Sequence, residues 1–290
     1  MKKAQAMKLL TKRKLKWRNQ FKPDILRGAP LNPNIAVANR YYEKLAKLIR
    51  HMSDETEKEL RRLFAEPHAT EFFAQDASIS SQARILTNAL MEKFNKLFAS
   101  LSKTMAEQVA NESDKASAAS VRTSLKELSG GLTLPQSALQ SGDLNEILNA
   151  TVTENVALIK SISQKYMNSV QQAVMRSITT GNGLQELIPY LESYKGITLR
   201  RAHFIALDQT RKAYAGLNKQ RMINAGIRKA EWLHSGGSNH PRKTHIRMSG
   251  EIFNLDEGLY DADVKKKIQP GQLPGCRCRM VPVISFNDEE

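Results

Sequence analysis

Apolar residues recur at helical spacing through most of this chain and change to an alternating pattern only near its C-terminal end. Between residues 36 and 64 one predicted helix face carries Tyr41, Leu45, Leu48, Ile49 and Met52, and Pro67 ends the pattern. A second helical run extends from Ile85 to Leu101, whereas small polar residues weaken the pattern between 113 and 124. We interpret these apolar stripes as packing faces between helices rather than as a ligand-binding box.

Helical periodicity resumes at residue 151 and predicts several further helices. Thr151 or Thr153 is expected to cap a helix that ends before Gly181-Asn182-Gly183. A short helix is expected around residues 184–191. Thr198 is then expected to cap a long helix that ends near Gly226.

Beyond Gly226 the pattern predicts strands at 227–234, at 251–253 and at 280–286, with Pro282 indicating an edge strand. The predicted fold class is α+β, with a mainly helical N-terminal half and a C-terminal unit of long helices plus a small antiparallel sheet. We divide the chain into a basic arm and linker (1–35), a helical domain (36–150) and a C-terminal domain (151–290).

Composition limits the class of protein. The chain has 290 residues, 41% of them hydrophobic, and a formal net charge of +15, which favours a polyanionic partner. No apolar run is long enough for a membrane helix, and the charged N-terminus lacks the apolar core of a secretory signal. The two cysteines form a poor disulfide framework, so we expect a soluble protein in a reducing compartment and no membrane partner.

The positive charge is concentrated in two places. Residues 1–22 contain nine Lys or Arg and no acidic residue, and residues 195–229 are similarly basic, with Asp208 as the one acidic residue. Both segments suit a phosphate backbone, although a solvated tail, a transit peptide or a plain solvated helix face are alternative readings. The residues we expect to bind a polyanion are Lys12, Arg13, Lys14, Lys16, Arg18, Arg200, Arg201, Arg211 and Lys212.

Residues able to bind a metal cluster where the helical pattern ends. Both cysteines lie in Cys276-Arg277-Cys278, and three of the six histidines precede them in the loop that includes His245. Thiolates and imidazoles suit a structural Zn²⁺ ion, with His245, Cys276 and Cys278 as preferred ligands, His234 as the fourth and His240 as its substitute. In the alternative reading, His245 and Arg242 hydrogen-bond the loop backbone and the cysteines are half-buried packing residues.

An ordered set of motifs resembles a known family. The set begins with Glu154-Asn155-Val156-Ala157-Leu158-Ile159-Lys160-Ser161-Ile162 and Arg201-Ala202-His203-Phe204-Ile205-Ala206-Leu207-Asp208-Gln209-Thr210. It continues through Trp232, Pro241-Arg242-x-x-His245 and Gly250-x-x-Phe253 to Pro274-Gly275-Cys276-Arg277-Cys278. It is similar to the phage head morphogenesis family, the Mu F-like minor head proteins of tailed phages and prophages, over about residues 151–285. The motif residues that carry the resemblance are Pro241, Arg242, His245, Gly250, Pro274, Cys276, Arg277 and Cys278.

The resemblance implies a minor capsid protein, made in the bacterial host cytoplasm and located inside the head of the virion. Its implied partners are portal, coat and scaffold proteins, and double-stranded DNA bound without sequence specificity. The alternatives are a nucleic-acid-binding protein unrelated to virions and a nuclease with a Cys/His site. We expect no enzymatic activity, because the sequence contains neither a nucleophile elbow nor a Gly-rich phosphate loop after a strand. The acidic residues Asp256, Glu257, Asp261 and Asp263 are interpreted as a solvated loop.

Overall fold

A computed structural model describes residues 8–13, 25–65, 79–131, 139, 142–181, 183–237 and 240–286. Its chain divides into two compact units, described separately below. One is a helical unit (38–107 and 152–206), and the other is a sheet unit (1–37, 108–151 and 207–290). This division cuts across the boundary at residue 150 drawn from the sequence, because each unit combines segments from both sides of it.

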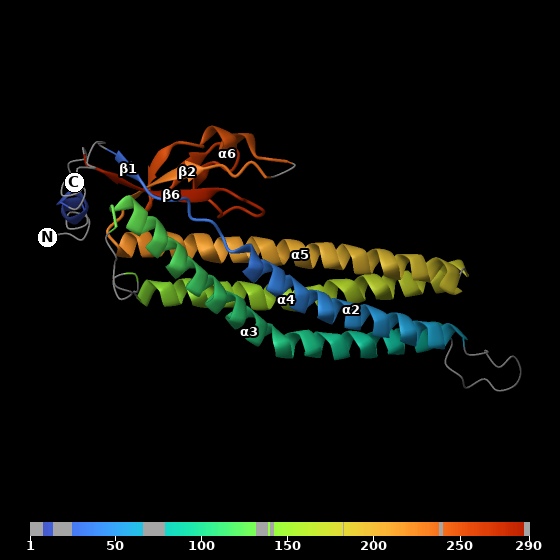
Figure 1. Cartoon of the computed structure of the whole chain (residues 1–290). Coiled ribbons are helices and arrows are strands. Elements are labelled where there is room, and N and C mark those ends of the chain that lie inside the picture. The colour runs from blue at the N-terminus through green and yellow to red at the C-terminus, as the bar shows by residue number, and fades with distance from the viewer. Residues whose placement is uncertain are drawn as a thin grey trace, which may run out of the picture. The chain divides into compact units, whose positions relative to one another are not determined.

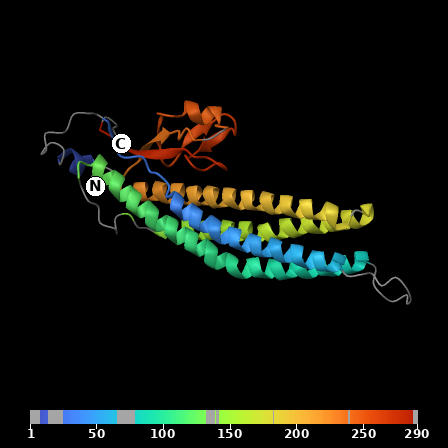
Figure 2. The same ribbon diagram turned by 45° about the vertical axis from the view of Figure 1, so that its right-hand side comes forward.

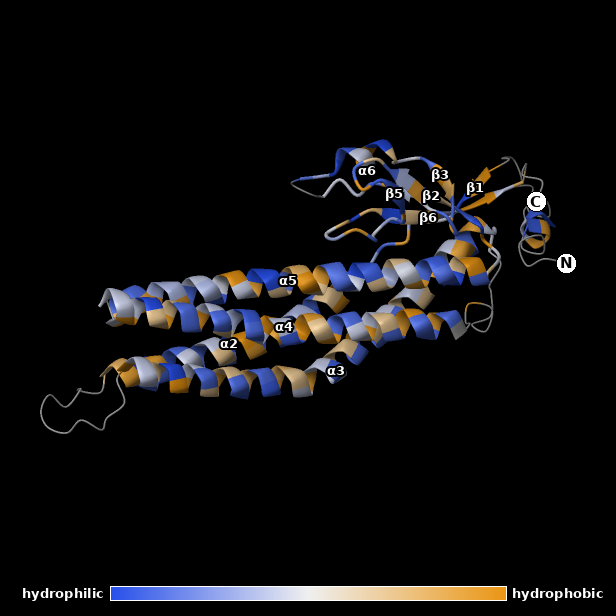
Figure 3. Cartoon of the chain, turned by 180° about the vertical axis from the view of Figure 1, so that it is seen from behind, coloured by the Kyte–Doolittle hydropathy of each residue, from blue (hydrophilic) through white to orange (hydrophobic). Residues whose placement is uncertain are grey.

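The helical unit is built from α2 (Ile35–Ala65) and from parts of α3 (Ile79–Leu128), α4 (Gly142–Thr180) and α5 (Gly183–Asn224). Within it these helices run side by side (Figures 1 and 2). Hydrophobic residues recur at intervals along every one of them (Figure 3), as the predicted stripes require. The buried core contains Leu45, Ile49, Met52, Phe94, Phe98, Ile159, Ile162 and Tyr166, which confirms the predicted packing faces.

Two predicted helix starts are wrong, because the helices are longer than the sequence signals indicated. Helix α4 begins at Gly142, so Thr151 lies inside it and its hydroxyl donates to the carbonyl of Ile147 at 2.8 Å. Helix α5 is continuous from Gly183, so Thr198 is an internal residue and not a cap. Pro189 lies within its second turn, where the lost backbone hydrogen bond is offset by burial of the flanking apolar side chains.

The small polar residues near the end of α3 do not interrupt it. Ser113, Ser117 and Ser124 are buried, and they allow other segments of the sheet unit to approach the helix closely. The Ser124 hydroxyl donates to the carbonyl of Ala29 at 2.6 Å, and that of Ser117 donates to Asn218 Oδ1 at 2.8 Å. Small serine side chains, two of them hydrogen-bonded to residues distant in sequence, thus replace the apolar stripe here, which is why periodicity alone underestimated the helix.

The sheet has the antiparallel order β1-β6-β2-β3 (Figure 1). Its strands are β1 (Ile25–Arg27), β2 (Lys229–Leu233), β3 (Ile252–Asn254) and β6 (Arg279–Ser285). The predicted strands β2, β3 and β6 and the α+β class are therefore confirmed. A hairpin of β4 (Leu259–Asp261) and β5 (Lys266–Ile268) and the short helix α6 (Lys243–Arg247) lie between β2 and β6 in sequence.

The expectation that Pro282 marks an edge strand is wrong. Strand β6 has β1 on one side and β2 on the other, and Pro282 is paired with Ala230. Pairing with β1 ends at Arg27, and beyond it the carbonyl of Pro282 accepts the N–H of Gly28 at 2.9 Å. A proline is tolerated because this contact uses its carbonyl and not the missing N–H.

The segment expected to be a linker takes part in the fold, since it supplies β1 and the buried Leu31. The core of the sheet unit surrounds Trp232, which is completely buried and packs edge-to-face on Phe253. Among the described residues, no helix combines the length and the apolarity that a membrane crossing needs.

Candidate metal centre

Three potential metal ligands converge above Trp232 in the sheet unit. His245 lies on α6, and Cys276 and Cys278 lie in the loop that leads into β6. The Nδ1 atom of His245 is 3.4 Å from the sulfur of Cys276 and 3.5 Å from that of Cys278. All three side chains are buried, and their donor atoms lie within 4.8 Å of one another. The structure therefore brings together the three preferred ligands predicted from the sequence.

The distances suit a tetrahedral ion. Typical Zn–S and Zn–N bond lengths place a sulfur and a nitrogen ligand about 3.6 Å apart across a tetrahedral site. The observed separations of 3.4 and 3.5 Å are close to that value. One imidazole and two thiols are also the donor types that zinc prefers over hard cations.

A buried carboxylate holds the opposite side of the histidine ring. Asp261 Oδ2 lies 3.2 Å from His245 Nε2, and the Asp261 side chain is completely buried. Oδ1 of Asp261 accepts the backbone N–H of Asp263 at 2.8 Å. A carboxylate on Nε2 favours the tautomer whose Nδ1 carries a lone pair toward the two sulfurs.

Electrostatics in this cluster favour a charged Asp261. Burial by itself would raise the pKa of Asp261, but hydrogen bonds from the backbone of Asp263 and from Thr244, with the charge of His245, hold that pKa below its usual value. The prediction that Asp261 belongs to a solvated loop is therefore wrong, whereas Asp256, Glu257 and Asp263 are indeed exposed. No sequence signal links Asp261 to His245, because only the β4–β5 hairpin brings them together.

The two thiols differ from each other. A hydrogen bond from Cys278 lowers the pKa of the Cys276 thiol to about 4, and the same interaction raises the pKa of Cys278. Such a pair shares one proton, which an ion at this position would displace.

His234, the predicted fourth ligand, lies close to one of the two cysteines. Its Nδ1 lies 3.6 Å from the sulfur of Cys278, but it is not one of the three mutually close donors. It is half-buried, and its backbone N–H donates to Ser249 Oγ at 3.1 Å. His240, the predicted substitute, is exposed and lies outside the close group.

The remaining motif residues fix the loops around the cluster. Arg242 donates to the carbonyl of Pro274 at 2.9 Å, so the alternative reading of Arg242 as a backbone-binding residue is correct. Gly250 adopts φ 94°, and its N–H donates to the carbonyl of Trp232 at 2.8 Å. The N–H of Gly275 donates to Asp208 Oδ1 at 2.6 Å, which ties the cysteine loop to α5. Asp208, named only as part of a motif, is thus a structural support of the site.

The predicted polyanion-binding residues are distributed over both units. Lys12 and Arg13 are exposed in a helical segment at 8–13, whereas Lys14, Lys16 and Arg18 lie outside the described residues. Arg200 is exposed and Arg201 half-buried in the helical unit, and Arg211 and Lys212 are half-buried in the sheet unit. Arg201 donates to Ser161 Oγ at 2.8 Å, and Lys212 forms an ion pair with Asp208 at 2.9 Å. These predictions remain untested by the geometry alone.

One basic residue of α5 serves a different purpose. Arg221 is 3% exposed, forms an ion pair with Asp114 on α3 and donates to Ser117 Oγ at 2.7 Å. Its charge is therefore used inside the sheet unit and is not presented on a positive helix face. Sequence reasoning missed this pair because Asp114 and Arg221 are distant in the chain.

Comparison with known proteins identifies the segment that contains this site. Residues 168–281 match the family described as phage Mu protein F like protein. An uncharacterized protein of Haemophilus influenzae is 32% identical over 253 residues, covering 86% of this chain and 54% of that protein. The uncharacterized protein YqbB of Bacillus subtilis is 22% identical over 125 residues, covering 40% of this chain and 41% of its own length. The chain thus spans about half the length of these curated relatives, and no solved structure matches it.

The matched segment includes α5, all strands from β2 to β5, and the ligands His245, Cys276 and Cys278. The resemblance inferred from the ordered motifs is therefore confirmed. Residues 168–281 of this chain thus match the family model of phage Mu protein F-like proteins, as the ordered motifs indicated.

Proposed function

We propose that this protein is a minor head component of a tailed phage or prophage, which acts during procapsid assembly near the portal vertex. The observation that carries the proposal is the family match over residues 168–281. The implied partners are portal, coat and scaffold proteins, and the implied location is the interior of the head.

The charge of the chain supports a further contact with packaged DNA. A net charge of +15 suits an interior filled with phosphate, and neutralising contacts of this kind need no recognition of bases. Lys12, Arg13 and Arg200 have exposed side chains. We therefore include non-specific binding of double-stranded DNA in the proposed function.

The sheet unit, in this proposal, holds a structural Zn²⁺ ion through His245, Cys276 and Cys278, with His234 as the fourth ligand. The ion would supply a cross-link between α6, the loop before β6 and the end of β2. Its support is the donor set, the tetrahedral spacing and the carboxylate on His245 Nε2. The strands around it are short, so a cross-link contributes more here than it would in a large sheet.

The same residues resemble a thiol nucleophile with a histidine and a carboxylate, which is the main catalytic alternative. Cys276 and His245 are only 4% and 2% exposed, and a substrate must be able to reach a nucleophile. Burial on all sides suits a structural ligand instead. We accordingly propose no enzymatic activity for this site.

Quantitative mass spectrometry of purified particles tests the assembly role. We expect the protein at a few copies per portal both in DNA-free procapsids and in mature heads of the phage or induced prophage that carries the gene. Its absence from both particles would refute the proposed function.

Elemental analysis of the purified chain tests the zinc site. We expect about one zinc per chain in the wild type, loss of zinc and a lower melting temperature for Cys276→Ser, and a weaker site for His234→Asn. The exposed His240→Asn is the matched control and should retain zinc. A metal-free wild type whose stability equals that of Cys276→Ser would contradict the assignment.

A further inference from the structure

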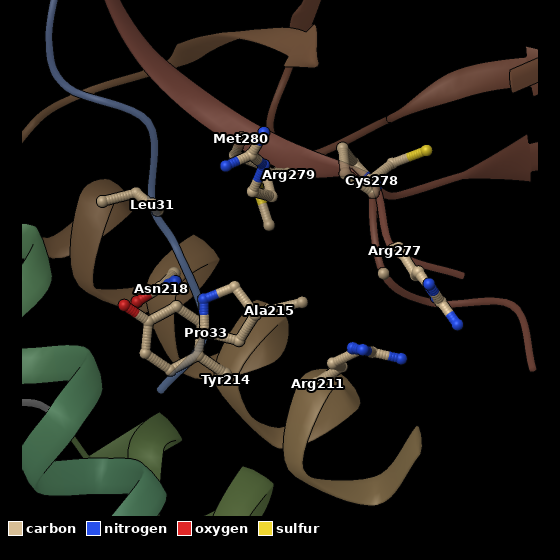
Figure 4. A pocket seen from close by; sticks show the side chains of 12 residues that line it. Leu31, Pro33, Arg211, Tyr214, Ala215, Asn218, Arg277, Cys278, Arg279 and Met280 are labelled. Atoms are coloured by element: carbon tan, nitrogen blue, oxygen red, sulfur yellow. The ribbon is translucent and has the colours of Figure 1, made fainter. Parts of the chain in front are cut away.

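A second candidate site lies on the other side of the cysteine loop, in a small cavity within the sheet unit. It is bounded by α5, by the turn at Pro270-Gly271 and by the start of β6. Figure 4 shows the sulfur of Cys278 directed away from this cavity, so the cavity is separate from the metal centre. The space inside it that water-sized molecules can occupy is only about 20 Å³, so it can hold no more than a compact group.

Three arginines from different elements line this cavity. Arg211 comes from α5, Arg277 from the cysteine loop and Arg279 from β6. The guanidinium groups of Arg211 and Arg277 extend to the same side of the cavity (Figure 4). Part of the remaining wall is apolar, with Leu31, Ala215 and Met280. Arg211 and Arg279 are half-buried, so water screens their charges less than on an open surface, whereas Arg277 is exposed.

The arginines lack carboxylate partners among the described residues. Arg277 donates to the carbonyl of Gly237 and Arg279 to Asn32 Oδ1, and both are uncharged acceptors. The Nε atom of Arg279 is buried without a hydrogen-bond partner in the described part of the chain. The adjacent carboxylate, Asp208, is already bound to Lys212 and to the N–H of Gly275. A guanidinium has several donors, so each arginine retains hydrogen-bonding capacity for a ligand.

Charge repulsion within the cavity points in the same direction. Burial lowers the pKa of Arg211 and the positive charge of Arg277 lowers it further, whereas the charges of Asp208 and Cys276 act in the opposite direction. An anion between Arg211 and Arg277 would reduce the repulsion between these two like charges. The turn that closes the cavity is also tightly fitted, because a Cβ on Gly271 would lie 3.0 Å from the Cβ of Ala215.

We propose that this cavity binds a single phosphate group, held by Arg211 and Arg277 with Arg279 adding positive charge from the opposite wall. Planar guanidinium groups match the oxygens of phosphate in paired hydrogen bonds, which favours arginine over lysine at such sites. The phosphate belongs either to a nucleic-acid backbone or to a free phosphate compound. The first source rests on the proposed function, whereas binding of phosphate itself does not.

Thermal unfolding of the purified full chain with inorganic phosphate, against chloride at matched ionic strength, tests the site. We expect a saturable rise of the melting temperature in the wild type and about tenfold or greater weakening of phosphate affinity in Arg211→Gln. The phosphate affinity of Arg211→Lys should lie between those of the wild type and Arg211→Gln, because lysine keeps the charge and loses the paired hydrogen-bond geometry. Arg228→Gln removes the same charge from an exposed position of the sheet unit and should match the wild type.

Circular dichroism without phosphate verifies that each variant is folded. The proposal is overturned if the wild type shows no saturable response, or if Arg211→Gln and Arg228→Gln respond equally. Binding of a short DNA duplex at several salt concentrations then identifies the source. A salt slope about one unit lower for Arg211→Gln than for Arg228→Gln assigns a backbone phosphate, and equal slopes assign a free phosphate compound.

Discussion

Replacing Asp261 with Asn tests whether the carboxylate behind His245 tunes a metal site. The change keeps the size of the side chain, removes its charge and weakens the contact with His245 Nε2, now 3.2 Å long. Because Asp261 is completely buried, water cannot replace the lost acceptor. Outer carboxylates of this kind typically change metal affinity by about tenfold to a hundredfold.

That factor gives a magnitude for stability. At saturating zinc, a tenfold to hundredfold weaker site lowers the free energy of unfolding by about 1.4 to 2.7 kcal/mol, since metal binding and folding are linked. Competition with a chromophoric chelator gives the zinc affinity, and chemical unfolding of the zinc-loaded and zinc-free forms gives the stability. Altering a buried group will lower the stability of both forms by the same amount. The additional loss of about 1.4 to 2.7 kcal/mol should appear only in the zinc-loaded form, as worked out above.

Asp263→Asn is the matched control. Asp263 is an exposed neighbour that accepts a hydrogen bond from Thr244 at 3.1 Å and does not touch His245 through its side chain. It should change zinc affinity by less than about threefold. Equal affinities for wild type and Asp261→Asn, or equal losses in both variants, would refute the reasoning.

Further substitutions test the packing of the two units. Burial raises the pKa of Tyr166 to about 12, so the folded state holds the phenolic proton more tightly than the unfolded state. The resulting contribution to the free energy of unfolding is complete below about pH 10 and is lost as the pH rises to about 12. Tyr166→Phe should not show this loss of about 2 to 3 kcal/mol when urea unfolding is measured across that pH range. Parallel pH profiles of stability for the wild type and Tyr166→Phe would contradict the prediction. Gly271→Ala should lower the free energy of unfolding by about 1 to 3 kcal/mol, because Gly271 has φ 83° and faces Ala215. An unchanged urea midpoint would be inconsistent with this turn geometry. Asp114→Ala should cost about 3 kcal/mol by leaving Arg221 buried without its carboxylate, and a cost near zero would mean that Arg221 finds another partner.

The fold was predictable wherever one face of an element is apolar and the other is polar. Residues 36–64 and the strands near Trp232 have that pattern, and the structure places them as expected. Helix ends were less predictable, because Thr151 and Thr198 are good capping residues that are also acceptable inside a helix, where a threonine hydroxyl can donate to the preceding turn as Thr151 does to Ile147. Strand β1 could not be identified, since three residues carry too little periodicity.

The same distinction applies to the candidate site. His245, Cys276 and Cys278 were identified because their residue types are rare here and their spacing is compact. Asp261 and Asp208 were not, because carboxylates are common on loops and helices and only the folded chain shows which of them is buried. Site residues that lie close together in the sequence can therefore be predicted from it. Residues that reach the site only through the β4–β5 hairpin or through α5 cannot.

The pairing of β1 with β6 has a consequence for the order of folding during synthesis. Ile25 pairs with Ser285, so β1 leaves the ribosome long before its partner strand exists. The helical unit needs no residue beyond 206 and can acquire its contacts first. Closure of the sheet is then a late, long-range step, and a nascent chain that stops before residue 279 would leave β1 and one side of β2 unpaired and prone to self-association.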